Sequence, residues 1–451
     1  MEYPGSHIIR PIRRALLITF IALFFIICPI LIMYTTGYRY DWQNGLLKET
    51  GVISIDVLPA KTEAYLNGLA VKKNIPIRLK NLTPQKYNLK LSLSGYYDWE
   101  KEVEVKNRQT VYIKEFSLLK KPEPKFLLAG TIGFISISDN GRWLIYADET
   151  KGKTNIWLDD LNNNSQTLIK TLPGIENIKV VWGKRYNYVA ISNAQAPFRW
   201  LITVNTENPK QKWDINYTVD SLITKYAWQE NLEPQLFFST ETNINAAQII
   251  PQKIINVAPN KYLDWQMDGN KIWALTWDTT TTQMILTKDI FGFSTDFARW
   301  QNDSNTRPSD WHLLSTYQDT LLLKNNKQTE KFFLVNKDNQ YSVTGQNWLI
   351  SPYNDWWIFW TPWEINTYSI GSAPILLNRY SEKLEQIIPL DEFNTLGIFW
   401  TNRATALFPY YSVSHDLLNE ATIARAVDSQ NKIMYFSGKI LLKEGLWKIS
   451  Y

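Results

Sequence analysis

The sequence predicts an all-β protein that carries one N-terminal transmembrane helix, a small β-sandwich and a larger domain of repeated strands. A long apolar run without charge near the N-terminus predicts the helix. Alternating apolar and polar residues between positions 51 and 119 predict the sandwich. A repeat of about 44 residues fills the remainder, and the 20 Trp, 24 Tyr and 19 Phe suit it, because large rings favour sheet packing.

Composition excludes several classes of function. Hydrophobic residues make up 45% of the 451 residues and charged residues 20%, as in an ordinary folded protein of two or three domains. The net charge of +5 is dispersed, so we expect no nucleic-acid partner. The single cysteine, Cys28, allows no intrachain disulfide and no cysteine-based metal site. No histidine motif links His7, His312 and His415, and we expect neither a metal nor a cofactor.

The N-terminal apolar run covers residues 15–33, which is nineteen positions without a charge. At about 1.5 Å rise per residue, this run spans the ~30 Å hydrocarbon core of a bilayer. A buried core helix is the alternative, but such a helix would carry a polar stripe that this run lacks. We therefore predict a transmembrane segment over residues 15–34 and a juxtamembrane segment over residues 35–50.

The flanks of this run predict an uncleaved signal anchor in a cell membrane. Its apolar stretch is longer than that of a signal peptide, and no Ala-x-Ala cleavage site follows it. The positive-inside rule places residues 1–14 in the cytoplasm and the bulk of the chain outside, because three arginines precede the run: Arg10, Arg13 and Arg14. Four aromatic residues that follow the run predict an interfacial belt: Tyr34, Tyr38, Tyr40 and Trp42.

Residues 51–119 predict a β-sandwich without helices. Residues 51–58 alternate as a strand does. Asn67 and Gly68 suit a two-residue hairpin turn, because both residues adopt positive φ readily. Three further strands are predicted from the same alternation, at residues 87–93, 101–105 and 110–116.

This segment resembles the PEGA domain, a small surface β-sandwich named after a Pro-Glu-Gly-Ala motif. The matching turn and strand residues are Pro59, Ala64, Leu66, Asn67, Gly68, Pro76, Leu79, Leu82, Pro84, Gly95, Tyr96 and Trp99. Residues 59–64 contain no glycine, and Gln85 stands where the family has glycine after proline. The resemblance implies an extracytoplasmic wall or surface setting, and it carries over no catalytic residue.

Residues 120–125 predict a linker rich in proline and charge, and residues 126–451 predict one repeated domain. Each unit has a turn, an apolar strand, a polar loop and a second strand. Seven units fit, 36 to 50 residues apart, so we predict a seven-bladed β-propeller; two successive β-sandwiches are the alternative. The units are anchored at Ser138, Trp182, Trp228, Trp265, Ser315, Ser351 and Trp400.

The first unit resembles the opening of a TolB-like propeller blade. In that family a Ser-Pro-Asp-Gly turn leads into an apolar strand, and residues 136–146 follow this plan here. Asp139 stands where the family has proline, and the other units match the motif less well. The propeller prediction therefore depends on the period more than on the motif.

A tryptophan-rich segment, SPYNDWWIFWTPWEI, covers residues 351–365. Trp356–Trp360 occupy the second strand of the sixth unit, and both faces of this strand are apolar. We therefore predict that neighbouring blades bury it on both sides. Trp363 lies beyond Pro362 and is predicted to be exposed, where its ring would suit a platform for a sugar or a peptide.

No catalytic motif accompanies this architecture, and we expect no enzyme. The Gly-x-Ser-x-Gly, Walker, Rossmann and His-Glu-x-x-His patterns are all absent. Asp139, Asp159 and Asp160 suit calcium, but turn chemistry explains them as well. We predict a membrane-anchored extracytoplasmic scaffold of a bacterial envelope, whose propeller binds an envelope protein. The alternatives are a protein that binds cell-wall or surface carbohydrate, and a wall-polymer hydrolase or lyase with acidic residues at the propeller mouth.

Overall fold

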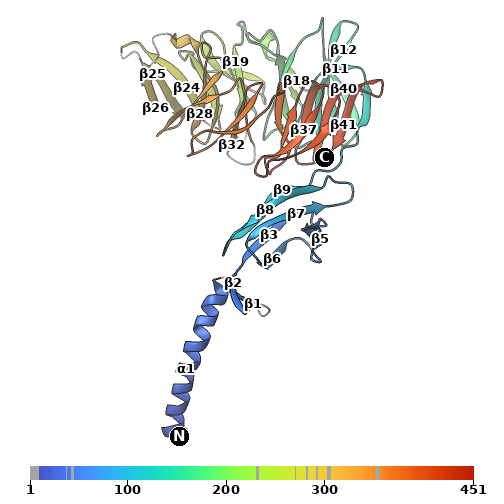
Figure 1. The fold of residues 1–451 in the computed structure, drawn as a ribbon. Coiled ribbons are helices and arrows are strands. Elements are labelled where there is room, and N and C mark those ends of the chain that lie inside the picture. The colour runs from blue at the N-terminus through green and yellow to red at the C-terminus, as the bar shows by residue number, and fades with distance from the viewer. Residues whose placement is uncertain are drawn as a thin grey trace, which may run out of the picture. The chain divides into compact units, whose positions relative to one another are not determined.

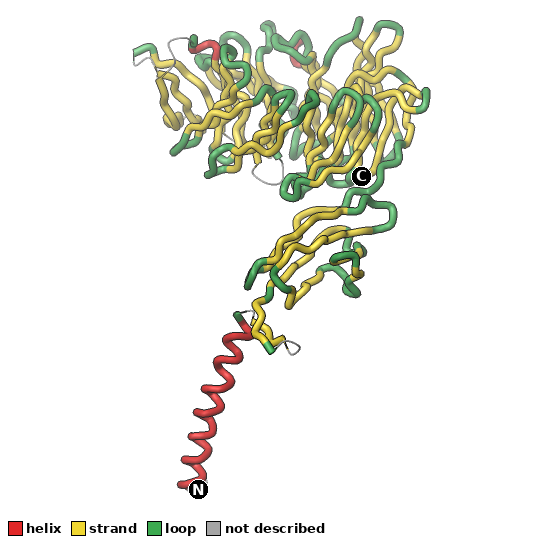
Figure 2. Tube along the Cα trace, viewed as in Figure 1, coloured by secondary structure: helices red, strands yellow, loops and turns green. Residues whose placement is uncertain are grey.

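The chain divides into two compact units, Met1–Lys120 and Lys121–Tyr451, and each is described by itself (Figure 1). Strands predominate in both units, and the long helix belongs to the first unit (Figure 2). Residues 1–9, which are part of the predicted cytoplasmic tail over residues 1–14, lie outside the described residues. Trp42 of the predicted aromatic belt also lies outside them. The structure, a computed structural model, describes residues 10–36, 38–41, 45–229, 233–269, 271–280, 283–290, 293–301, 306–351 and 356–451.

The first unit begins with helix α1 (Arg10–Thr35), which continues through Pro29. Among the described residues it is the one helix long and apolar enough to cross a membrane; within Ile12–Thr35 an 18-residue window has a mean hydropathy of 3.0, and no part of that window is buried. The Thr19 hydroxyl donates to the Ala15 carbonyl at 2.9 Å, so this polar group needs no water. Length and composition suit a membrane anchor or a signal sequence.

The rest of the first unit is a β-sandwich of two sheets, in the orders β6-β3-β9 and β5-β4-β7-β8. Ile55, Leu91 and Trp99 are fully buried between them, and the Trp99 ring lies 5.1 Å from the Phe116 ring of the other sheet. The strands are β3 (Gly51–Leu58), β4 (Glu63–Leu66), β5 (Leu69–Ala70), β6 (Ile77–Leu82), β7 (Gln85–Ser92), β8 (Trp99–Val105) and β9 (Thr110–Ser117), preceded by a separate pair, β1 (Tyr38–Asp41) and β2 (Leu46–Glu49).

The predicted hairpin turn of this sandwich is confirmed. Asn67 and Gly68 have φ of 50° and 80°, and Leu66 pairs with Leu69 across them. The strand predicted at residues 51–58 is also confirmed as β3. The alternation of apolar and polar residues was sufficient to predict this strand, because every second residue of β3 up to Val57 is buried.

Within the described ranges, the second unit contains eight four-stranded antiparallel sheets. Sheets 1 to 4 are built from β11 (Thr131–Ile137), β12 (Trp143–Thr150), β13 (Lys153–Asp160) and β14 (Ser165–Leu172); β15 (Ile178–Trp182), β16 (Tyr188–Asn193), β17 (Leu201–Asn205) and β18 (Lys212–Asp214); β19 (Lys225–Trp228), β20 (Gln235–Ser239), β21 (Asn243–Gln248) and β22 (Lys253–Pro259); and β23 (Asp264–Asp268), β24 (Lys271–Asp278), β25 (Gln283–Ile290) and β26 (Phe293–Gln301).

Sheets 5 to 7 continue this plan with four consecutive strands each. They are built from β27 (Trp311–Tyr317), β28 (Thr320–Asn325), β29 (Lys331–Val335) and β30 (Gln340–Thr344); β31 (Asn347–Ile350), β32 (Trp356–Trp360), β33 (Glu364–Ser369) and β34 (Ile375–Arg379); and β35 (Gln386–Pro389), β36 (Leu396–Phe399), β37 (Ala404–Phe408) and β38 (Val413–Leu418). Two short 3-10 helices, η1 (Ile215–Tyr217) and η2 (Pro308–Asp310), precede β19 and β27.

Sheet 8 joins the two ends of this unit, in the order β10-β41-β40-β39. Its strands are β10 (Lys125–Ala129), β39 (Thr422–Asp428), β40 (Ile433–Ile440) and β41 (Lys443–Ser450). The sequence predicted seven units, whereas the second unit contains eight sheets within the described residues. The period detected the seven sheets made of consecutive strands, whereas β10 and β41 lie more than 300 residues apart and leave no local repeat.

Each sheet packs on the next through apolar side chains. Ile145 and Leu158 of sheet 1 share a cluster with Val189 and Ile202 of sheet 2, and similar clusters join the following sheets up to sheet 7. Tyr146 of sheet 1 packs in a cluster with Tyr435 of sheet 8. Sheets 7 and 8 meet where the hydroxyl of Tyr451 donates to the Leu390 carbonyl at 2.6 Å.

The predicted double burial of the tryptophan-rich strand is confirmed. Trp357 and Phe359 of β32 have no exposed surface and belong to a cluster shared with sheet 5. Ile358 and Trp360 point the other way into a cluster shared with sheet 7. Residues 352–355 of this segment lie outside the described residues.

Because the strands of sheet 8 are antiparallel, its successive loops lie at opposite ends of the sheet. Lys125, where the chain arrives from the linker, pairs with Lys448, and Ile433 pairs with Ser450. The loop between β39 and β40 therefore lies at the end where the linker arrives, which we name the linker end. The turn between β40 and β41 lies at the opposite end, which we name the distal end.

Candidate functional site

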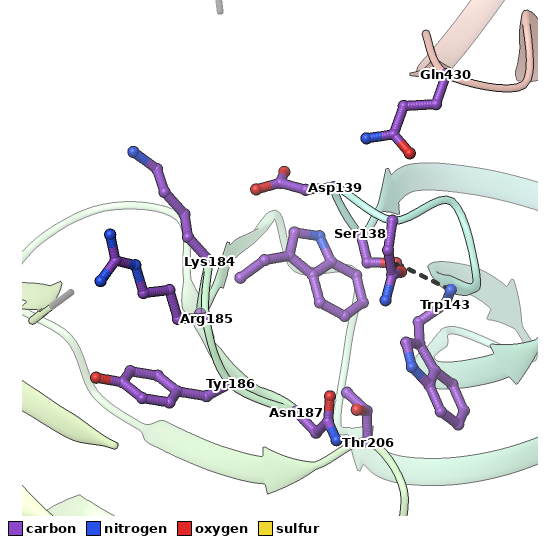
Figure 3. Close-up of a pocket in the computed structure, with 12 residues that line it drawn as sticks. Ser138, Asp139, Trp143, Lys184, Arg185, Tyr186, Asn187, Thr206 and Gln430 are labelled. Carbon is purple, nitrogen blue, oxygen red and sulfur yellow. Dashed lines mark hydrogen bonds between the residues drawn. The ribbon is translucent and has the colours of Figure 1, made fainter. Parts of the chain in front are cut away.

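A pocket of about 390 Å³ opens where linker-end loops of sheets 1, 2 and 8 meet (Figure 3). The loop between β11 and β12 forms one wall, and the loop between β15 and β16 forms the other. Gln430 reaches it from the loop that precedes β40. The lining residues are Ser138, Asp139, Asn140, Trp143, Trp182, Gly183, Lys184, Arg185, Tyr186, Asn187, Thr206 and Gln430.

The first wall is a tight polar turn. The Ser138 hydroxyl donates to Asn140 Oδ1 at 2.7 Å and accepts a hydrogen bond from the Trp143 backbone N–H at 2.9 Å. Gly141 has a φ of 68°, and a Cβ atom there would collide with the Asp428 carboxylate. Glycine at this position therefore serves both the turn and the close approach of sheet 8.

Arg142 does not line the pocket, but its contacts stabilise this wall. Its Nη2 lies 2.9 Å from Asp160 Oδ2, its Nη1 lies 2.6 Å from Glu207 Oε1, and its guanidinium stacks 4.4 Å from the Trp143 ring centre. The Arg142 guanidinium and backbone N–H groups hold the pKa of the Asp160 carboxyl at about 2, below its ordinary value. The hypothesis of calcium at Asp160 gains no support, since this carboxylate is already occupied by Arg142, Asn162 and Asn163.

We expect Asp160→Asn to lower the free energy of unfolding by about 1–2 kcal/mol at neutral pH. The folded-state pKa of Asp160 is depressed, so its stabilisation is present above about pH 4 and is lost as the pH falls toward 2. Denaturant unfolding of both full-length chains at neutral and acidic pH measures this. The matched control is Glu207→Gln, which removes the more exposed partner of Arg142 and should cost less. If Asp160→Asn lowered the free energy of unfolding equally at neutral and acidic pH, the depressed pKa of Asp160 would not be the source of the stabilisation.

The second wall carries the positive charge. Trp182 Nε1 donates to Ser136 Oγ at 2.9 Å, which ties the base of the loop to sheet 1. The Gly183 N–H donates to the Tyr188 carbonyl at 2.9 Å and closes the loop. Lys184 and Arg185 are exposed at its tip. In Figure 3 they lie at the left of the drawn residues, on the opposite side from Gln430.

The pocket combines cationic, aromatic and polar side chains, and Asp139 is the one carboxylate among its lining residues. The Thr206 hydroxyl is buried without a hydrogen-bond partner, and such a group ordinarily has one. Two cations beside tryptophan rings and a buried hydroxyl suit an anionic group attached to an apolar body.

Trp363, the platform residue expected from the sequence, lies elsewhere. It follows β32, its side chain is 53% exposed, and it does not line the pocket. Its backbone carbonyl accepts a hydrogen bond from the Tyr380 N–H at 2.8 Å, so the loop is held in place. The predicted exposure is confirmed, and the role as a platform stays a prediction.

Sequence reasoning singled out the turn at Ser138 as a propeller motif, not as part of a binding site, and it missed the loop that forms the other wall. The turn at Ser138 was noticed because it resembles a propeller motif. The loop of residues 183–187 follows Trp182, which marked a repeat, but a Gly-Lys-Arg-Tyr-Asn loop carries no recognised motif. A pair of adjacent cations in an inter-strand loop was the only signal available.

Comparison with known proteins identifies part of the first unit. Residues 50–117 match the PEGA domain family. The predicted resemblance is therefore confirmed for the segment that forms β3 to β9. This PEGA segment supplies no residue of the pocket, because all lining residues belong to the second unit. No curated protein sequence matches the chain.

Solved structures similar to the chain include propellers. The Dos1 propeller shares 9% identity, with 73% of this chain and 94% of that chain covered and a TM-score of 0.48. The Cps50 (Swd1) β-propeller domain of Myceliophteria thermophila shares 9% identity, with coverages of 72% and 97% and a TM-score of 0.39. The N-terminal domain of Nup159 shares 11% identity, with coverages of 73% and 95% and a TM-score of 0.40.

Proposed function

We propose that this protein is a membrane-anchored scaffold of the bacterial cell envelope that binds another protein through the pocket at Ser138. In this proposal α1 is an uncleaved anchor, residues 1–14 are cytoplasmic, and the PEGA segment and the second unit are extracytoplasmic. The arginines ahead of the apolar span support this orientation. The surface setting of PEGA domains supports the location.

The second unit is, in this proposal, a closed eight-bladed propeller. Packing of each sheet on the next supports closure, as does the contact of sheet 8 with both sheet 1 and sheet 7. Arg425 of sheet 8 adds to that last contact, since its guanidinium lies 3.0 Å from the Glu385 carboxylate. Closure removes exposed sheet edges, which are otherwise sites of aggregation.

One observation carries the binding proposal: a preformed pocket presents Lys184 and Arg185 beside Trp182, with a single carboxylate among its lining residues. An acidic side chain or a terminal carboxylate of a protein partner fits this combination. The lack of paired acid and base groups in the pocket supports a role without catalysis. The exposed ring of Trp363 favours the second candidate, carbohydrate binding at a separate place.

The test places a photo-crosslinking amino acid at Gln430, which lines the pocket and leaves both cations intact. In the full-length chain in its native membrane, we expect a discrete adduct with one protein. The reversal Lys184→Glu with Arg185→Glu should reduce that adduct by about tenfold, equivalent to about 1.4 kcal/mol.

The matched control carries the same crosslinker at Lys151, an exposed turn residue between β12 and β13 that does not line the pocket. It should give no such adduct. If the adduct persisted after reversal of the two charges, the partner would bind outside the pocket. Binding to a glycan array that depends on Trp363, with no protein adduct at Gln430, would favour the carbohydrate alternative.

A further inference from the structure

A second pocket lies between sheets 6 and 7, and it shares no lining residue with the pocket at Ser138. Its volume is about 320 Å³. Strand β34, at one edge of sheet 6, contributes to one wall, and β37 of sheet 7 contributes to the other together with the loops on either side of it. We name it the sheet 6–7 pocket.

The sheet 6–7 pocket extends along β37. Antiparallel strands counted back from β39 place the loop with Trp400 and Arg403 at the distal end and the turn with Pro409 and Ser412 at the linker end. All four of these residues line the pocket. Because the 5 residues of β37 separate them, the two ends lie about 17 Å apart, and the pocket suits an elongated ligand.

Part of the lining is apolar. Leu377 of β34 and Leu407 of β37 belong to the cluster that joins sheets 6 and 7. The half-buried Tyr380 ring lies 5.6 Å from the Trp400 ring, at an interplanar angle of 78°. The Arg403 guanidinium stacks on Trp400 at 4.3 Å from its ring centre. Trp400 is therefore packed between two neighbours, and the Tyr380 ring supplies the aromatic surface of the pocket.

Hydroxyl groups share the face of sheet 7 that carries Leu407. Thr405 precedes Leu407 by two strand positions, and Ser414 pairs with Leu407 across β37 and β38, so all three point to the same side. Thr405 is 6% exposed and lines the pocket, but its hydroxyl forms no hydrogen bond with any described residue. A buried hydroxyl ordinarily has a partner, so Thr405 is placed to bond to a polar molecule in the pocket.

The charges around the pocket are compensated where they line it. Arg403 is the one charged group among the described lining residues, and its Nε and Nη2 lie 3.1 and 2.6 Å from Glu382 Oε2. Arg379 nearby on β34 is paired with Glu364 at 3.3 Å. Asp416 of β38 is exposed and does not line the pocket. The lining itself therefore carries no uncompensated charge.

This combination selects a class of ligand. A lipid would need a mainly apolar lining, and an anion would need an uncompensated cation. A neutral saccharide needs an apolar surface for its C–H face, and side chains that both donate hydrogen bonds to its hydroxyl groups and accept them. The Tyr380 ring and the two leucines supply the first, while the hydroxyl groups, the Asn378 amide and the Arg403 guanidinium supply the second.

We propose that the sheet 6–7 pocket binds a short neutral saccharide, with its C–H face on the Tyr380 ring and its hydroxyl groups bonded to Thr405 and Ser414. This site goes beyond the proposed binding of a protein at Ser138, and it does not depend on the anchoring by α1. The Tyr380 N–H donates to the Trp363 carbonyl at 2.8 Å, but the Trp363 side chain does not line the pocket. The site is therefore distinct from a platform at the Trp363 ring.

The test records saturation-transfer NMR of maltose, cellobiose and diacetylchitobiose with the full-length chain in lipid nanodiscs, which avoid sugar-based detergents. We expect transfer from the protein to the ring protons of one or more of these disaccharides. Ser414→Trp fills the pocket from an exposed position and should weaken the binding by about tenfold or more. The matched control is Ser165→Trp, at an exposed serine of the edge strand β14, which should leave the binding unchanged.

A second variant removes one hydroxyl and keeps the shape of the side chain. Thr405→Val should leave the free energy of unfolding unchanged or raised, while the affinity falls about fivefold with the loss of one hydrogen bond. Unchanged affinity in Thr405→Val would overturn the role of that hydroxyl.

Two further results would overturn the saccharide site as a whole. One is the absence of transfer to all three disaccharides at millimolar concentration. The other is saccharide binding that persists in Ser414→Trp, and its loss in Trp363→Ala would then place the sugar at that ring. If pooled uncharged peptides bound instead, and Ser414→Trp abolished their binding, the pocket would be a peptide site. The crosslink at Gln430 reports the pocket at Ser138 separately.

Discussion

Trp357→Ala is expected to lower the free energy of unfolding of the second unit by about 3–5 kcal/mol. The Trp357 ring has no exposed surface and lies between Trp348 and Phe359, at ring-centre distances of 6.1 and 6.4 Å. Removing it leaves a cavity that two packed sheets cannot readily close. Denaturant unfolding of the full-length chain in detergent micelles measures the loss.

Trp363→Ala is the matched control for this prediction. Its side chain is 53% exposed, and its backbone hydrogen bonds do not depend on the ring. We expect a change within about 0.5 kcal/mol. Equal losses from both substitutions would show that the Trp363 ring is part of the core. An unaffected Trp357→Ala protein would contradict the packing of β32 between sheets 5 and 7.

Removal of β41, by deletion of residues 443–451, is expected to open the second unit. β41 pairs with both β10 and β40, so its loss leaves β10 without a partner and separates the two ends of the unit. It also removes the Tyr451 hydrogen bond to sheet 7. We expect the melting temperature to fall by about 10 °C or more, with rapid hydrogen exchange of the β10 amides.

A point variant tests the same pairing without truncation. A Cβ atom on Gly445 would collide with the Leu128 carbonyl of β10, so Gly445→Ala should weaken the β10–β41 contact. Gly133→Ala in β11 is the control, because its Cβ would meet only the flexible end of Glu149, at 3.2 Å. A deletion that leaves melting unchanged would favour separate sandwiches over one unit.

The sequence alone was sufficient to predict features that depend on residues close together along the chain. The charge-free run predicted α1, and alternation predicted β3, because side chains on successive strand residues point to opposite faces. Asn67 and Gly68 predicted their turn, because few residue types adopt positive φ. Apolar residues on both faces of β32 predicted that Trp357 is buried.

Only the tertiary structure decided which distant segments meet. The eighth sheet joins β10 to β41, and strand pairing over that separation depends on the packing of all the intervening sheets rather than on a local pattern. The pocket at Ser138 likewise needs loops from sheets 1, 2 and 8, which only the tertiary structure brings together. The turn between β40 and β41 also became visible only with the backbone, because Leu441 and Leu442 have positive φ and are exposed, whereas an apolar pair in a strand-rich sequence predicts burial.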